Sequence, residues 1–309
     1  MPRGYFTQSA MVLFEKAPSI DDVARAIAEL EPRQREMDAK STQWMSSATD
    51  LLVGFRPEAH GELAIDVVDA PWPDEMGDPE SDADLFGAWT MGSFGPLVFP
   101  GNLERAAQQA VAFEGAEALT QKHGGFVRLR TTYVIGAGED AKVVPDNWDP
   151  MEELMAILGA SRALLELPGA LAYFDPNAEV ILPREALDSA IAHSMALKLP
   201  PIDLFSHVRL FQIDEQWSLM DTVGLERFFL PDIEIAIDQR IDPNQAAEFL
   251  RNVSLFLLAK GPVVKAGHTM DGPGGRYVAS EREESLVEPP RKVVRLVPEG
   301  ATLPADLTD

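Results

Sequence analysis

The first 140 residues alternate short apolar runs with turn residues, and this order constrains the fold more than any other feature of the chain. Short apolar runs bounded by turn residues are typical of strands, whereas apolar residues that recur every three or four positions are typical of helices. Strands are predicted at 10–14, 51–55, 62–68 and 126–135. One helix is predicted to begin after the N-cap residue Ser19. A second helix is predicted over 103–113, with Asn102 as its N-cap.

This order, β-α-β-β-α-β, predicts a ferredoxin-like α+β domain over residues 1–140. Two helices would cover one face of a four-stranded antiparallel sheet. A long acidic loop, residues 71–101, would separate the third strand from the second helix. Loops of this length are either functional or loosely ordered.

Residues 150–297 predict a second α+β domain with a mostly antiparallel sheet. Helices are expected over 151–167, from Pro183 to about Leu197, and from Asp242 to Ala259. A hairpin over 171–182 is assigned to this domain. The acidic, Pro-containing segment 298–309 is expected to be a loose tail.

The charge of the chain restricts its partners. The formal net charge is −24, although hydrophobic residues make up an ordinary 46% of the composition. Such a surface repels the phosphates of nucleic acids and anionic membranes. We therefore expect no nucleic-acid or membrane partner, and we expect a basic protein as the partner.

The cysteine count and the first residues bear on compartment and chemistry. The chain has no cysteine, so disulfides, thiolate metal sites and a cysteine nucleophile are excluded. The apolar run at 10–14 is too short for the core of an export signal. A cytoplasmic location is expected, and no cofactor is predicted.

Six carboxylates lie between Asp74 and Asp84, with no lysine or arginine among them and a tryptophan on either side. Aromatic residues beside a field of charge are typical of protein interfaces. The partner-binding candidates are Trp72, Asp74, Glu75, Asp78, Asp82, Asp84, Phe86 and Trp89. In the plainer interpretation the aromatic residues pack the loop onto the core and the acids face solvent. A calcium loop is a third interpretation, but the stretch lacks the glycine that an EF-hand turn requires.

Three short motifs in the second half carry a family resemblance. They are Asp221-Thr-Val-Gly-Leu225, then Leu230-Pro-Asp-Ile-Glu234, and, after a long helix, Gly261 to Met270. Over Ser206–Asp271 the chain resembles the bacterial family called domain of unknown function DUF4261. In that family a TxGL…LPDxE stretch precedes a helix and a GxxxxxGxT hairpin. The resemblance implies a fold relative and implies no reaction.

The same motifs contain the candidate metal ligands. Asp232 and Glu234 share one face of a predicted strand, because side chains alternate along strands, and paired carboxylates can bind a divalent cation. With Asp221 and His268 they form the candidate metal site of a metal-dependent hydrolase. The plainer interpretation is an edge strand that turns a polar face to water.

The sequence shows no complete catalytic constellation, and there is no G-x-S-x-G elbow or H-E-x-x-H pair. The preferred hypothesis is therefore a non-enzymatic protein-binding module, such as an immunity or accessory protein for a basic partner. The metal-dependent hydrolase is the first alternative. The second is a structural scaffold or homo-oligomer that associates through a sheet edge.

Overall fold

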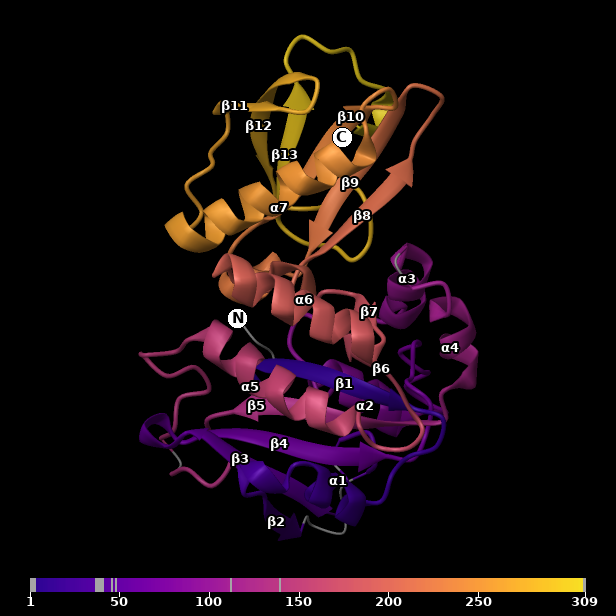
Figure 1. The fold of residues 1–309 in the computed structure, drawn as a ribbon, viewed down its shortest axis with the longest axis vertical. Helices are drawn as coiled ribbons and strands as arrows, with labels where there is room; N and C mark the ends of the chain where they lie inside the picture. Colours follow the sequence, from indigo (N-terminus) through magenta and orange to yellow (C-terminus); the bar gives the residue numbers. More distant parts are fainter. Residues whose placement is uncertain are drawn as a thin grey trace. The chain divides into compact units, whose positions relative to one another are not determined.

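The computed structural model describes residues 4–36, 42–45, 47, 49–111, 113–138 and 140–307. It shows an α+β protein that divides into two compact units, Met1–Ser189 and Ala190–Asp309. Figure 1 gives the element labels used below. Among the described helices, none combines the length and the apolar character needed to cross a bilayer.

The first unit is built on a seven-stranded sheet in the order β2-β3-β4-β5-β1-β6-β7, with all neighbours antiparallel. Its strands are β1 (Gln8–Phe14), β2 (Arg33–Glu36), β3 (Thr49–Arg56), β4 (Gly61–Val68), β5 (Gly125–Thr132), β6 (Ala170–Asp175) and β7 (Val180–Leu182). Its helices are α1 (Ile20–Ala26), α2 (Ala83–Thr90), α3 (Asn102–Gln109), α4 (Ala116–Lys122) and α5 (Pro150–Leu164), with short 3-10 turns η1 (Ala28–Leu30) and η2 (Pro57–Ala59). Helix α6 (Arg184–Leu197) runs across the boundary between the units.

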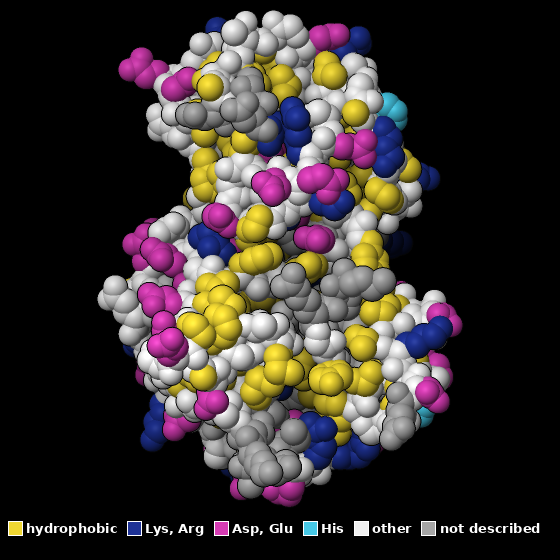
Figure 2. Space-filling model, turned by 180° about the vertical axis from the view of Figure 1, so that it is seen from behind, with side chains coloured by type: hydrophobic (Ala, Val, Ile, Leu, Met, Phe, Trp, Pro, Cys, Tyr) yellow, Lys and Arg dark blue, Asp and Glu magenta, His cyan; other side chains and the backbone are white. Residues whose placement is uncertain are grey.

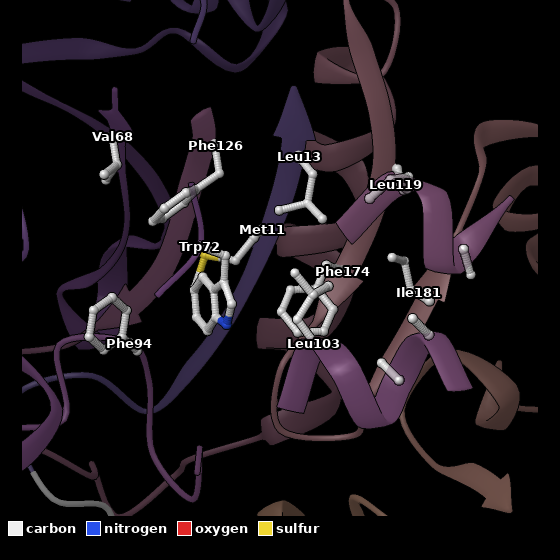
Figure 3. Packing of buried hydrophobic residues seen from close by; sticks show 14 of the residues in the cluster. Met11, Leu13, Val68, Trp72, Phe94, Leu103, Leu119, Phe126, Phe174 and Ile181 are labelled. Atoms are coloured by element: carbon white, nitrogen blue, oxygen red, sulfur yellow. The ribbon is translucent and has the colours of Figure 1, made fainter. Parts of the chain in front are cut away.

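Strand β1 lies inside the sheet, between β5 and β6, and is buried along its whole length. On one face Met11 and Leu13 belong to an aromatic core around Trp72, and Figure 3 shows Trp72 beside Met11 and close to Phe126. The alternate residues of β1 are equally buried, and α5 contacts both β1 and β5. Both faces of the sheet centre are therefore covered, which explains why β1 is apolar without alternation.

The ferredoxin-like arrangement is not confirmed. A split βαβ unit requires parallel strands in one sheet, joined by helical crossovers. Here β1 lies between β5 and β6 and is antiparallel to both. The helix predicted over 103–113 is shorter than expected, because α3 ends at Gln109, and a further helix that was not predicted, α4, begins at Ala116.

The division between the units, after Ser189, lies later in the chain than the predicted division between residues 140 and 150. The hairpin of β6 and β7 was assigned to the second domain, but β6 pairs with β1 and so completes the first sheet. Helix α5 begins where it was expected, since Asp149 caps it and Pro150 takes the first turn. Its contacts with β1 and β5 place it in the first unit as well.

The second unit has a six-stranded sheet in the order β11-β12-β13-β10-β9-β8, antiparallel except for the β10–β13 pair. Its elements are η3 (Ile202–Leu204), β8 (His207–Gln212), β9 (Trp217–Val223), η4 (Leu225–Phe228), β10 (Asp232–Asp238), α7 (Pro243–Lys260), β11 (Thr269–Gly272), β12 (Gly275–Arg282), β13 (Val293–Pro298) and η5 (Ala305–Leu307). Helix α7 covers one face of the sheet (Figure 1). There Leu250 and Leu257 of the helix belong to the same apolar core as Ile233 and Ile235 of β10. The mostly antiparallel sheet and the helix capped by Asp242 agree with the prediction.

The opposite face of this sheet is covered by irregular chain. Leu307 is 1% exposed and packs with Trp217 and Leu219, and the segment after β12 contributes Leu286. The tail predicted to be loose over 298–309 therefore packs on the sheet through Ala301, Leu303 and Leu307. Residues 308 and 309 lie outside the described part of the chain.

Candidate functional site

The two tryptophans that flank the acidic stretch belong to the interior. Trp72 is 4% exposed and Trp89 is 8% exposed. The Trp72 ring centroid lies 5.2 Å from that of Phe94 and 5.4 Å from that of Phe126, in edge-on geometry. Each indole N–H has an acceptor, Asn102 Oδ1 at 2.9 Å for Trp72 and the Glu75 carbonyl at 3.0 Å for Trp89. Neither ring is available as an anchor for a partner, and Phe86 is half-buried.

Two of the candidate acids hold local structure. The carboxylate of Asp74 accepts from the N–H groups of Leu103 and Glu104, at 2.9 and 2.8 Å, and so caps α3 from a distance in the sequence. This is the role that the sequence suggested for Asn102, which is instead buried in the first turn of α3. Asp78 accepts from two backbone N–H groups that follow it, and these bonds lower its pKa. Glu75, Asp82 and Asp84 are exposed and remain candidates for partner binding.

A buried histidine fixes the start of this stretch. His123 is 5% exposed, and its Nε2 accepts the backbone N–H of Trp72 at 2.8 Å. Its Nδ1 lies 3.2 Å from the Leu119 carbonyl, which assigns the proton to Nδ1. Burial lowers the pKa of His123, so the ring is neutral near pH 7.

The candidate carboxylates of the second unit lie in a row of charges across its sheet. In register, Arg209 on β8 faces Asp221 on β9, Asp221 faces Glu234 on β10, and Glu234 faces Arg295 on β13. All four side chains are at most 3% exposed. Arg209 Nη2 is 2.6 Å from Asp221 Oδ2, and Arg295 Nε is 2.9 Å from Glu234 Oε2. The two central carboxylates are therefore each held by an outer arginine.

A fifth charge, Arg291, reaches this row from the segment between β12 and β13. It pairs with Asp221, its Nε lies 3.5 Å from Asp232 Oδ2, and it donates to the Thr222 carbonyl. The N–H of Leu286 in the same segment donates to Glu234 at 2.7 Å. We call residues 283–292 the strap, because these bonds fasten it over the charged face.

Asp232 closes the turn between β9 and β10. It accepts from Thr222 Oγ1 at 2.8 Å and from the N–H groups of Gly224 and Leu225. Gly224 has φ 121, a conformation that favours glycine. The TxGL…LPDxE pattern is thus a set of structural contacts, in which the threonine, the glycine and the aspartate fix one turn.

The hydrolase hypothesis requires these acids to converge on an ion with His268. Burial raises the pKa of Asp232 to about 6 and also raises that of Glu234, although Arg291 and Arg295 oppose these shifts. His268 is exposed before β11, which β12 and β13 separate from β10. Within the described ranges, no group of three or more His, Asp and Glu side chains could hold a metal ion. The structure brings Asp221, Asp232 and Glu234 together as partners of arginines and leaves His268 apart.

The first unit contains a charge cluster that the sequence reasoning missed. Asp66 on β4 is paired with Arg128 and Arg130 on β5, at 2.6 and 3.1 Å, and all three are at most 1% exposed. Burial opposes ionisation of Asp66, but the two guanidinium groups outweigh it and hold the pKa of Asp66 well below its usual range. Arg128 also donates to the Trp44 carbonyl at 2.7 Å. The alternation of Arg128 and Arg130 with apolar residues places both on one face of a strand, but it does not indicate that this face is buried.

Helix α5 carries a buried acid in its first turn. Glu153 is fully buried and accepts from Thr7 Oγ1, and burial raises the pKa of Glu153 to about 7. Thr7 also lies 3.0 Å from Thr131 Oγ1 on β5. This group links the N-terminal strand, the sheet and the helix.

The fold and these sites define an α+β protein of two units, each with arginine–carboxylate pairs in its interior. The family model of the domain of unknown function DUF4261 matches residues 221–297, which is a partial match that lies wholly in the second unit. The resemblance expected over Ser206–Asp271 is confirmed in its overlap with that range, and the match extends further, through the strap and most of β13. No curated protein and no solved structure matches the chain.

Proposed function

We propose that this protein is a non-enzymatic binding module that recognises a basic protein partner, as an immunity or accessory protein would, in the bacterial cytoplasm. One observation carries the proposal: most of the charges in the interior are paired, so most of the surplus of acid lies at the surface. Asp66, Asp221 and Glu234 are each matched to buried arginines. Most of the formal net charge of −24 therefore comes from solvent-facing side chains.

A surface of this kind accelerates encounter with a cationic protein and repels polyphosphates. Figure 2 shows acidic side chains spread over the visible face instead of gathered in one patch. Long-range attraction would therefore come from many dispersed acids and not from one patch on this face. Glu75, Asp82 and Asp84 are exposed candidates for closer contact.

The hydrolase alternative has less support than the binding module. Its carboxylates are occupied by arginines on a covered sheet face, whereas a catalytic metal needs free oxygen ligands and an open position. The exposed acids, in contrast, need no rearrangement to meet a cationic partner.

The test is capture of a partner by the immobilised full chain at low and at high salt. We expect a basic protein that is retained at low salt and released at high salt, with an affinity that falls steeply as salt rises. A variant with Glu75→Gln, Glu80→Gln, Asp82→Asn and Asp84→Asn measures how much the acidic stretch contributes to the affinity for the partner. The matched control neutralises the exposed acids Glu29, Glu104, Glu117 and Glu248. Recovery of no basic protein, or capture that is indifferent to salt, would refute the proposal.

A further inference from the structure

An open hollow lies in the first unit, between the end of β3, the turn η2 and the first turns of α5. Its volume is about 490 Å³, which is within the range of small-ligand pockets. Phe55, Met151 and Met155 supply apolar lining, and Arg56, Glu58 and Glu152 supply charges. Met155 is 46% exposed although it is a large hydrophobic residue, so part of this apolar surface faces solvent.

The charges of the hollow favour a cation. Arg56 Nε lies 3.1 Å from Glu58 Oε1 and 3.1 Å from Glu152 Oε2. The Arg56 side chain is only 11% exposed, whereas those of Glu58 and Glu152 are 61% and 57% exposed. The guanidinium of Arg56 in the wall thus pairs with both carboxylates at the rim. One positive and two negative charges leave the hollow with a net negative charge.

An anion has no comparable place here. The start of a helix attracts anions, and α5 begins in this hollow. The backbone N–H groups of its first turn already have an acceptor within the protein. The Asp149 carboxylate accepts from Met151 at 2.8 Å and from Glu152 at 3.3 Å. Asp149 also lines the hollow and adds a further negative charge.

We infer that this hollow receives an arginine or lysine side chain of the basic partner, an inference that rests on the proposed function. Such side chains combine an apolar stem with a charged head. The stem would lie against Met151 and Met155, whose thioethers adapt to varied shapes. The head would meet Glu58 and Glu152, near the ring of Phe55, which attracts cations. Arginine is also among the residues that dominate binding energy at interfaces.

The experiment titrates the full chain, labelled at the methionine methyl groups, with the peptide acetyl-Ala-Arg-Ala-amide and follows NMR shifts. Met151 and Met155 report on the hollow, and the exposed Met76 reports on the acidic stretch. We expect saturable shifts at Met151 and Met155, with binding at least about tenfold weaker for the norleucine peptide, which keeps the stem and lacks the charge. Glu58→Gln with Glu152→Gln should abolish the shifts, and Glu104→Gln with Glu117→Gln should leave them unchanged.

Three results would overturn the inference. They are equal shifts with the norleucine peptide, shifts that persist in the Glu58→Gln/Glu152→Gln variant, and shifts at Met76 that match those at Met151 and Met155. In each of these cases salt-sensitive capture of a basic protein would still stand, so the proposed function would survive without this hollow. Saturable shifts without capture of any basic protein would instead establish the hollow as a cation site and remove the proposed function.

Discussion

The backbone N–H of Trp72 donates to Nε2 of His123 over 2.8 Å, so the attachment of the acidic stretch to the core depends on a neutral imidazole. A protonated ring carries hydrogen on both nitrogens and cannot accept this bond. Because burial lowers the pKa of His123 in the folded state, the unfolded chain binds a proton more readily. The stabilisation is present above the unfolded pKa and is lost as the pH falls below it toward the folded value.

The first prediction concerns acid stability. From about pH 7 to about pH 5 the contribution of His123 to the free energy of unfolding of the first unit should fall by about 1–3 kcal/mol, the cost of leaving a buried donor unsatisfied. Protonation of Glu153, whose pKa burial raises to about 7, acts in the opposite direction and is common to the parent chain and the variants. His123→Gln should flatten this slope, because a glutamine oxygen can accept from Trp72 without titrating. Urea unfolding, followed by tryptophan fluorescence at several pH values, measures this pH dependence in the parent chain and in the His123→Gln variant. His193→Gln, at an exposed position, is the control, and an unchanged slope in His123→Gln would contradict the prediction.

The second prediction concerns the pair of Asp66 with Arg128 and Arg130. Removal of one partner from a buried ion pair leaves uncompensated charge in the interior, which typically costs about 3–5 kcal/mol. Asp66→Asn keeps the shape of the side chain and removes its charge, so it should lower the free energy of unfolding by an amount in this range. Urea unfolding is the measurement.

The control for Asp66 is the exposed pair of Lys142 and Asp146, whose atoms are 2.7 Å apart. Exposed pairs contribute about 0–1 kcal/mol, so Asp146→Asn should change stability little. Equal effects of Asp66→Asn and Asp146→Asn would show that the buried cluster is not a stabilising element.

Local chemistry made several elements predictable from the sequence. Ser19 caps α1 by accepting from the Asp22 N–H, and Asp242 caps α7 by accepting from the Asn244 N–H. In both cases the residues that fix the helix start are neighbours in the chain. The pairing of β1 with β6 was not predictable in this way, because the two strands are far apart in sequence and both read as apolar runs.

The charged sites were also not predictable where their contacts join distant segments of the chain. Alternation placed Asp232 and Glu234 on one face, as observed, but an alternating face reads equally well as facing water or facing a partner. The partners, Arg291 and Arg295, come from a later segment, and the strap that covers the face has no regular structure. The sequence left two interpretations of the tryptophans open, an anchor for a partner or packing onto the core. Packing is what the structure shows, and it was not decidable from the sequence because the aromatic residues that surround Trp72 come from separate parts of the chain.

The third prediction separates acids that hold structure from acids that only face solvent. Asp74→Ala removes the acceptor for the N–H groups of Leu103 and Glu104 and should lower the free energy of unfolding by about 0.5–2 kcal/mol, as loss of a helix cap does. Asp84→Ala, at an exposed position in the same stretch, should change it by less than about 0.5 kcal/mol. Urea unfolding of the two variants is the comparison. A larger effect for Asp84→Ala would mean that the cap is not what orders this region.

The fourth prediction concerns Arg291 and the strap. Arg291→Met removes a cation from Asp221 and Asp232 and frees the strap from the Thr222 carbonyl. The free energy of unfolding of the second unit should fall by about 3–5 kcal/mol at neutral pH, as for any buried pair that loses one partner. Proteolysis should cut first within 283–292, because the strap retains fewer bonds to the sheet.

The pH dependence of this variant distinguishes lost charge compensation from lost packing. Burial already raises the pKa of Asp232 to about 6, and removal of Arg291 should raise the pKa further. A carboxyl whose folded pKa is raised binds its proton more tightly in the folded state, so it stabilises the fold in acid and this contribution is lost as pH rises. Arg291→Met should therefore be less destabilising near pH 5 than near pH 8, measured by urea unfolding at both. If packing alone were lost, the difference from the parent chain would be the same at the two pH values.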